Sequence, residues 1–303
     1  QSFPSVKTLE TVTDDPKELN PFSYVMEKHQ RNYGGNGKIA KYMQAAYRYP
    51  ENFSDFVYAS QLLQADGIRY GVEHYRRNRG RCMGAIYWQL NDCWPVISWS
   101  SIDYYGRWKA LHYYAKRFFA PVMLSCEEQS WMTVEADMNR QHFEFEKSIR
   151  LNVTNETLDA HRVLVKWAVR KTDATILREE EQWLEVPALS AVWMDKVELP
   201  QIDCFNEYVS YEAWENDQII SQGTVIFSYP KYFHYLNPGL AVRVDGDEIV
   251  VKAEAYAKSV EIRNENDDLI LEDNYFDMNA GEYRVKILDG KPDGLKVRSV
   301  YDI

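Results

Sequence analysis

Three tryptophans and three polar side chains fall within twelve residues of the segment 84–114. The tryptophans are Trp88, Trp94 and Trp99, and the polar residues between them are Gln89, Asn91 and Asp92. A pyranose ring has an apolar C–H face that packs on an aromatic ring, and hydroxyls around its edge that need hydrogen bonds. Residue types in this pattern can supply both parts of a sugar-binding surface.

The position of the segment supports the same interpretation. The apolar run at 82–88 predicts a short buried strand, so the cluster follows directly after a strand. In a β/α barrel the carboxyl ends of the strands form the active face. The alternative is that the tryptophans belong to the core and the polar groups cap a loop. Composition alone leaves both interpretations open.

Glycoside hydrolysis needs two carboxyl groups flanking the bond that is cleaved. Only Asp92 and Asp103 lie close to the tryptophans in sequence, and neither has an evident partner. Glu73 falls on the helix before the predicted strand, where we expect an ion-pairing or surface residue. The sequence of this chain therefore does not show the pair of carboxyl groups that glycoside hydrolysis needs.

No metal or cofactor site is predicted. The histidines His29, His74 and His112 are too dispersed for a metal site, and the acidic segments 245–248 and 264–268 are interpreted as solvated turns. The four cysteines contain no CxxC pair, so they indicate neither a disulfide framework nor a zinc site.

Charge and hydropathy exclude two classes of partner. The chain has 46 acidic and 35 basic residues, and its net charge of −11 repels phosphate backbones, so no nucleic-acid partner is expected. The basic run at 76–81 is interpreted as a helix end, where cations are favourable. No run of about 18 apolar residues occurs, so no membrane partner is expected either.

The N-terminal sequence QSFPSVKTLE lacks the basic and apolar regions of a signal peptide. It also lacks an initiating methionine, which is typical of a processed or truncated chain. A cytoplasmic location is favoured on this basis, although we expect the true N-terminus to be absent.

The chain changes character near residue 121. Before it, apolar residues at helical spacing predict helices over 54–78 and 106–119, one on each side of the strand at 82–88. Helix, buried strand, loop and helix in this order are typical of an α/β architecture with parallel strands.

After residue 121 the apolar period becomes two, which indicates an antiparallel sandwich. Strands are predicted over 148–156 and 162–171, and a hairpin over 207–227 with Asn216 and Asp217 in its turn. A second β pattern follows the Pro-containing connection at 229–239, with a hairpin turn at Asp245–Gly246. The predicted domains are 1–121, 122–228 and 229–303.

Three segments resemble a known family. MGAIYWQLNDCWPVISWSSIDYYGRWKALHYYAKRFFAPV closely resembles the last strand and helix of the catalytic barrel of β-mannosidases in glycoside hydrolase family 2. QSFPS resembles the segment just after the family's nucleophile, and LEDNYFDMNAGEYRVKI resembles its terminal immunoglobulin-like domain. The resemblance covers the chain nearly end to end and is weakest in the middle sandwich.

The resemblance implies a multidomain fold of α/β plus all-β type. Residues 1–121 would be the C-terminal part of a (β/α)8 barrel, and residues 122–228 and 229–303 would be two immunoglobulin-like β-sandwiches. About six of the eight barrel strands, together with the nucleophilic and acid/base glutamates, are then expected upstream of Gln1. No catalytic residue is assigned within the chain.

The resemblance also implies roles for four residues. Trp88 would be the aromatic floor under the sugar in the bond-cleaving subsite, and Asn91, Asp92 and Trp94 would support it. The intact parent would be a retaining exo-β-mannosidase that releases terminal β-D-mannosyl residues from oligosaccharides or glycoconjugates, with no metal or organic cofactor. The chain alone is expected to be inactive.

The expected partner is a β-mannoside oligosaccharide. Because a partial barrel would expose a strand edge and an apolar helix face, a homodimer or packing against an absent part of the polypeptide is also expected. Two alternatives stay open: a non-catalytic carbohydrate-binding or interaction module, and another family 2 activity such as exo-β-glucosaminidase or β-galactosidase.

Overall fold

The computed structural model describes residues 1–134 and 144–303, and this part of the chain divides into two compact units. The first unit contains residues 1–69, 86–116 and 237–303, and the second contains residues 70–85 and 117–236. Each unit thus joins segments that are far apart in the sequence. Residues 135–143, inside the predicted domain 122–228, lie outside the described part. The predicted domain boundaries at 121 and 228 remain predictions.

Most of the helical structure lies before residue 120. The helices are α1 (Val6–Leu9), α2 (Tyr24–Lys28), α3 (Gly35–Ala46), α4 (Phe53–Arg77) and α5 (Ala110–Phe118), with short 3-10 turns η1 (Glu10–Val12), η2 (Pro16–Glu18), η3 (Pro230–Tyr232) and η4 (Val300–Asp302). Helix α4 confirms the predicted helix over 54–78. The second predicted helix, over 106–119, starts four residues late because Trp108 forms a β-bridge with Ile102 instead.

The predicted strand at 82–88 is wrong. Residues 82–87 have no regular secondary structure, and they pair with no strand in the described residues. The side chain of Ile86 is 100% exposed and that of Met83 is 70% exposed. An apolar run forms a strand only where neighbouring strands take up its backbone hydrogen bonds, and the described residues provide none. The partial barrel is therefore not established by this structure.

The basic run at the end of α4 is engaged within the second unit. The Arg76 guanidinium donates a hydrogen bond through Nη1 to the carbonyl of Phe118 at 2.7 Å. The Arg77 Nη1 donates to the carbonyl of Cys126 at 3.2 Å and lies 3.5 Å from the Glu73 carboxylate. Glu73 is thus the ion-pairing residue that we expected, and the two arginines are buried structural residues.

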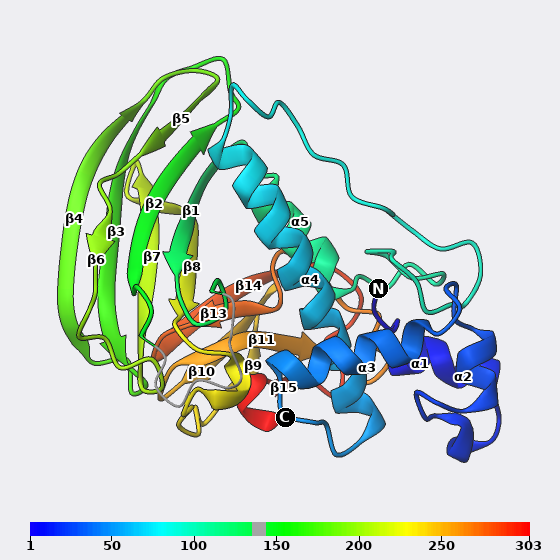
Figure 1. The fold of residues 1–303 in the computed structure, drawn as a ribbon. Helices are drawn as coiled ribbons and strands as arrows, with labels where there is room; N and C mark the ends of the chain where they lie inside the picture. Colours follow the sequence, from blue (N-terminus) through cyan, green and yellow to red (C-terminus); the bar gives the residue numbers. More distant parts are fainter. Residues whose placement is uncertain (135–143) are drawn as a thin grey trace. The chain divides into compact units, whose positions relative to one another are not determined.

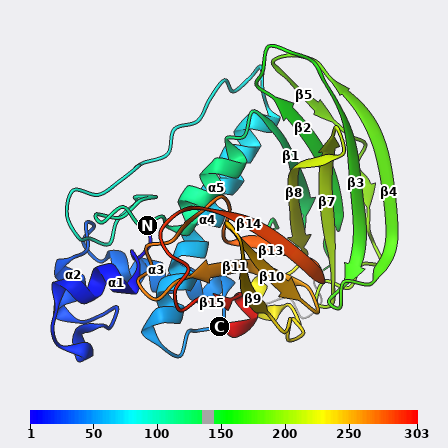
Figure 2. The same ribbon diagram turned by 180° about the vertical axis from the view of Figure 1, so that it is seen from behind.

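A large antiparallel sandwich forms the body of the second unit (Figure 1). Its strands are β1 (Val122–Gln129), β2 (Ser148–Asn155), β3 (His161–Lys171), β4 (Ile176–Val186), β5 (Ser190–Trp193), β6 (Val197–Glu198), β7 (Glu207–Glu215) and β8 (Gln218–Ile226). One sheet has the order β1-β2-β5, with β6 also paired to β2, and the other has the order β4-β3-β7-β8. Figure 2 shows the second sheet from behind in the same order.

The period-two patterns of the sequence predict this sandwich correctly. In β3 the side chains of Val163, Val165 and Trp167 are buried in the core shared by the two sheets. The β7–β8 hairpin turns at Asn216 and Asp217, which have φ values of 50° and 61°. Positive φ at both turn residues is the type I′ geometry that matches the twist of paired strands.

Among the strands of the described residues, β4 pairs only with β3, so it is an edge of its sheet there. Its first eight residues, Ile176–Trp183, are exposed on both faces of the strand. Only Leu184 and Val186, near its end, are buried.

A smaller set of strands contributes to the first unit. These are β9 (Ala241–Asp245), β10 (Glu248–Ala253), β11 (Ala257–Arg263), β12 (Ile270–Leu271), β13 (Phe276–Met278), β14 (Gly281–Asp289) and β15 (Lys296–Arg298). One sheet has the order β12-β14-β10-β9 and the other β13-β11-β15, and all pairs are antiparallel. The hairpin predicted at Asp245–Gly246 is present, with Gly246 at a φ of 66°.

No helix in the described part of the chain is both long enough and apolar enough to cross a membrane.

Candidate functional site

The tryptophan-rich segment folds back on itself as a loop of the first unit. The backbone N–H of Ser101 donates to the carbonyl of Gln89 at 3.0 Å, and the N–H of Ile102 donates to the carbonyl of Leu90 at 2.8 Å. Ile102 also forms isolated β-bridges with Asn91 and with Trp108. The peptide bond between Trp88 and Gln89 is cis. Backbone contacts therefore define the shape of the loop.

Trp88 is the most accessible of the clustered tryptophans. Its side chain is 72% exposed, so the ring is not part of the core. The structural alternative of a buried indole fails for this residue. Its role under a sugar remains a prediction, but the face that such a role needs is open in this chain.

Trp94 packs against a histidine that sequence reasoning did not include in the site. The rings of Trp94 and His29 lie 5.1 Å apart at an interplanar angle of 37°. His29 is held by a hydrogen bond between its Nδ1 and the carbonyl oxygen of Pro95, at 2.6 Å. Trp94 keeps 38% of its surface exposed, so it combines a packing contact with an accessible edge.

Asp92 is buried beneath the loop and holds it in place. Its carboxylate accepts hydrogen bonds from the hydroxyls of Ser98 at 2.7 Å and Ser100 at 2.5 Å. The Gln89 amide is a longer third donor at 3.4 Å, and it also donates to the carbonyl of Asn91 at 2.9 Å. Asp92 is 6% exposed and its oxygens are occupied, so it acts as an anchor of the loop.

Asp103, the other carboxyl group near the tryptophans, is also committed. Its Oδ1 accepts from the backbone N–H groups of Tyr105 at 2.9 Å and Arg107 at 3.0 Å. Its Oδ2 accepts a hydrogen bond from the hydroxyl of Thr8. Asp103 is 2% exposed. Neither aspartate is therefore free to attack a substrate or to exchange a proton with one.

A fully buried lysine lies beneath the same loop. The Nζ of Lys109 donates to the carbonyl of Ser2 at 3.3 Å. Burial lowers the pKa of Lys109 to about 8, although the charges of Asp92 and Asp103 favour its protonated form. The lysine and the two aspartates form a buried charge cluster that supports the loop from below.

A second series of polar contacts connects the start of the loop to α5. The Tyr87 hydroxyl lies 2.8 Å from the Ser101 hydroxyl, which in turn lies 3.1 Å from Nδ1 of His112. Burial lowers the pKa of His112, so this ring favours its neutral form. The His112 ring also packs against Trp108, with 4.4 Å between the ring centroids. These contacts fix the residue that precedes Trp88.

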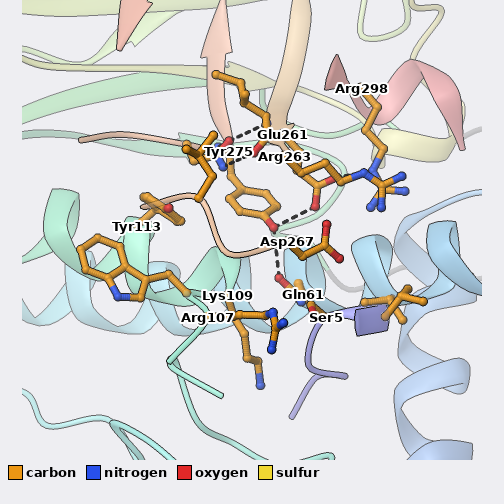
Figure 3. Close-up of a pocket in the computed structure, with 16 residues that line it drawn as sticks. Ser5, Gln61, Arg107, Lys109, Tyr113, Glu261, Arg263, Asp267, Tyr275 and Arg298 are labelled. Carbon is orange, nitrogen blue, oxygen red and sulfur yellow. Dashed lines mark hydrogen bonds and ion pairs between the residues drawn. The ribbon is translucent and has the colours of Figure 1, made fainter. Parts of the chain in front are cut away.

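A small polar cavity of about 40 Å³, which Lys109 also lines, lies in the first unit (Figure 3). In its wall, the Tyr275 hydroxyl donates to the Glu261 carboxylate at 2.9 Å, and Arg298 forms a short charge-assisted hydrogen bond with the same carboxylate. A second guanidinium nitrogen of Arg298 lies 3.0 Å from Asp55. The cavity has room for water molecules but is smaller than a typical ligand pocket. It marks a buried ion-pair network between α4 and the small sheets.

Within residues 1–134 and 144–303, no group of three or more His, Cys, Asp or Glu side chains is placed to hold a metal ion.

The pH dependence of stability provides a test of the buried lysine. Lys109 has a pKa of about 8 in the folded chain and an ordinary value of 10.5 when unfolded, so the unfolded chain binds more protons between these values. The free energy of unfolding should therefore rise as pH increases from about 8 to about 10.5.

Substitution of Lys109 by methionine should abolish this rise. The comparison is made by urea unfolding of both proteins across the window, because other titrating groups cancel in the difference. Between pH about 8 and about 10.5, we expect the free energy of unfolding of wild type to rise by on the order of 2 kcal/mol relative to that of Lys109→Met. A constant difference between the two proteins would show that Lys109 is protonated normally in the folded state.

Comparisons with known proteins define the class first. Residues 147–232 match a family model described as a Mannosidase Ig/CBM-like domain, and residues 235–303 match one described as an Ig-fold domain. Two adjacent domains of this kind indicate a protein built like a mannosidase.

Two β-mannosidases are similar to the chain in sequence. The chain is 29% identical over 329 residues to Beta-mannosidase B of Thermothelomyces thermophilus, covering 99% of this chain and 38% of the relative. It is 38% identical over 136 residues to Beta-mannosidase of Capra hircus, covering 41% of this chain and 15% of that relative. The chain is similar to the C-terminal portion of β-mannosidases of glycoside hydrolase family 2.

Two solved structures show the fold. A β-D-mannosidase from Dictyoglomus thermophilum superimposes with a TM-score of 0.82 at 24% identity, covering 99% of this chain and 36% of the other. The exo-chitosanase of Amycolatopsis orientalis gives a TM-score of 0.68 at 15% identity, covering 98% and 41%. The present chain therefore spans little more than a third of the length of the first relative and of the first structure.

Proposed function

We propose that the chain is the C-terminal part of a retaining exo-β-mannosidase that releases terminal β-D-mannosyl residues from oligosaccharides or glycoconjugates. Residues 1–121 would form the end of its (β/α)8 barrel, and residues 122–228 and 229–303 its two terminal sandwiches. The β-mannosidase relatives support the substrate class. The observation that carries the proposal for the site is the exposed indole of Trp88 on a loop anchored from below.

Each residue of the loop then has a separate task. Trp88 offers its face to the apolar side of the mannose ring in the bond-cleaving subsite. Asp92 keeps the loop in shape through its serine partners, and Asn91 and Trp94 contribute accessible edges around the sugar. These are positioning and binding tasks, and none of them breaks a bond.

The bond-breaking groups come from outside this chain in the proposal. A retaining mechanism needs two carboxyl groups about 5–5.5 Å apart, one as nucleophile and one as acid and base. Asp92 and Asp103 are both held by donors of their own chain, which makes them unsuitable for either task. Two glutamates of the preceding barrel segment would supply this chemistry, and no cofactor is required.

The test uses a polypeptide as long as the relatives and an aryl β-mannoside as substrate. Trp88→Ala should lower kcat/KM by about tenfold or more, because stacking and apolar contact with the sugar are lost. Tyr104→Ala is the matched control, since it removes another ring that is 46% exposed from a nearby loop.

The 303-residue chain alone should show no turnover. Activity of the isolated chain that survives repeated purification, or full activity of the Trp88→Ala variant, would contradict the proposal.

An exo-β-glucosaminidase is a second candidate, because the exo-chitosanase of Amycolatopsis orientalis shares the fold over 98% of the chain. Comparison of kcat/KM for aryl β-mannoside and aryl β-glucosaminide separates the two. A non-catalytic carbohydrate-binding module is the third, favoured by the CBM-like description of residues 147–232. A reading frame that extends upstream through glutamate-bearing barrel strands would exclude the module.

A further inference from the structure

The outward face of the β4-β3-β7-β8 sheet presents rows of polar side chains. Residues that alternate with the buried Val165, Trp167 and Val169 of β3 point away from the core. The strand register places the outward residues in rows that cross three strands. One row contains Glu179, Ala168 and Ser210, and the next contains Glu181, Lys166 and Glu212.

This face contains a hollow of about 490 Å³. The two small side chains Ala168 and Ser210 lie at its centre, and longer charged side chains surround them. The outward residues that line it are Lys166, Ala168, Arg170, Glu179, Glu181, Ser210 and Glu212, which we call the sheet hollow. Its volume lies in the range of ligand-binding pockets, whereas the cavity beside Arg298 is too small.

An apolar row borders the sheet hollow on one side. Leu164 on β3 lies between Trp183 on β4 and Trp214 on β7, in direct cross-strand register. Trp183 is 54% exposed, although the Arg162 guanidinium lies 4.5 Å from its ring centroid. Because Arg162 is itself largely exposed, it can move aside for a ligand at little cost. An aromatic face and a polar hollow thus lie next to each other on one sheet.

The charges around the sheet hollow select the ligand class. The three carboxylates of Glu179, Glu181 and Glu212 outnumber the two cations of Lys166 and Arg170. This balance disfavours phosphates, nucleic acids and acidic sugars. A strongly cationic ligand would meet the two cations within the same hollow.

Donors and acceptors alternate within the hollow. Lys166 lies 3.7 Å from Glu181, and Arg170 donates to the Ser210 hydroxyl at 2.9 Å. Glu212 accepts from the Trp214 indole N–H at 2.8 Å. A sugar hydroxyl both donates and accepts, so a chain of hydroxyls matches this alternation.

We propose that the sheet hollow and the adjacent tryptophan row bind a neutral hexopyranose oligosaccharide, with Trp183 stacking on a ring and the charged rows bonding its hydroxyls. The rows from Glu179 to Trp183 extend about 13 Å along β4, enough for more than one sugar ring. The surface involves none of the residues 86–103. It is a binding surface without catalysis, and it does not depend on the proposed mannosidase activity.

The experiment uses the full 303-residue chain carrying Trp88→Ala, so that binding at the loop cannot contribute. β-1,4-Linked mannohexaose is the probe, and binding is followed by titration calorimetry and tryptophan fluorescence. We expect saturable binding in this background and an approximately tenfold weaker affinity when Trp183→Ala is added.

Trp193→Ala is the matched control. Trp193 lies on β5 in the other sheet and carries an arginine, Arg150, 4.6 Å from its ring centroid, as Trp183 does. The control should bind mannohexaose as the parent does. Ala168→Leu, which fills the centre of the hollow without removing a ring, should weaken binding by a similar factor, and circular dichroism verifies that it folds.

Each outcome decides the proposal. Absence of binding in the Trp88→Ala background, or equal affinity with and without Trp183, would overturn it. Tighter binding of a glucosamine hexamer than of mannohexaose would overturn the assignment to a neutral sugar. None of these results bears on hydrolysis, so failure here leaves the proposed mannosidase activity untouched.

Discussion

Replacement of Arg298 by alanine is expected to lower the free energy of unfolding by about 3–5 kcal/mol, because it leaves a buried carboxylate without its cation. The Arg298 and Glu261 side chains are 13% and 9% exposed, and they form a direct ion pair. Burial opposes the charge on Arg298, but Glu261 outweighs it and raises the pKa of the guanidinium above its ordinary value. The pair is thus strongly coupled.

Urea unfolding followed by circular dichroism measures the effect. Lys7→Ala serves as the control, because its pair with Glu10 is 40% and 42% exposed and should contribute little. The double variant Arg298→Met with Glu261→Leu should recover most of the lost stability, since it removes both charges. If Arg298→Ala unfolds like wild type, the pair is not a buried ion pair in solution.

Asp92→Ala is expected to destabilise the first unit by about 3–5 kcal/mol. The substitution leaves the hydroxyls of Ser98 and Ser100 without their acceptor and removes a charge that favours protonated Lys109. Each buried donor without a partner costs about 1–3 kcal/mol, and a buried charge that loses its compensation costs more. Asp92→Asn, which keeps one acceptor, should lose about half as much.

Thermal unfolding measures the loss, and quenching of tryptophan fluorescence by acrylamide reports the loop. The matched control is Asp195→Ala, which replaces an exposed aspartate in the other unit. If Asp92 supports the loop, quenching should change in Asp92→Ala below its unfolding temperature and stay unchanged in the control. A variant as stable as wild type would show that the serine contacts are dispensable.

The large sandwich was predictable because its signal is local. A strand such as β3 alternates buried and outward residues along a single stretch, and the β7–β8 turn has residues that favour positive φ. The indole of Trp88 is exposed, and its role under a sugar stays a prediction. The alternation along β3 and the β7–β8 turn depend on residues that are neighbours in the sequence.

Contacts between distant segments were not predictable in the same way. Lys109 owes its place in the site to a carbonyl 107 positions earlier, and Tyr58 donates to the carbonyl of Ser259 at 2.6 Å. Such contacts join residues 1–69 with residues 86–116 and with residues 237–303, and no short stretch of sequence reveals them. The strand predicted at 82–88 failed for a related reason: an apolar run does not show whether neighbouring strands are present to pair with it.

The charged edge of strand β4 also affects the tendency of the protein to aggregate. The outermost strand of a sheet leaves a row of backbone amides and carbonyls able to recruit a strand from another molecule. In β4 this rim carries three consecutive glutamates, 179–181, all exposed to solvent. Two copies that approached rim to rim would bring like charges together, so the carboxylates keep the strand from seeding aggregates.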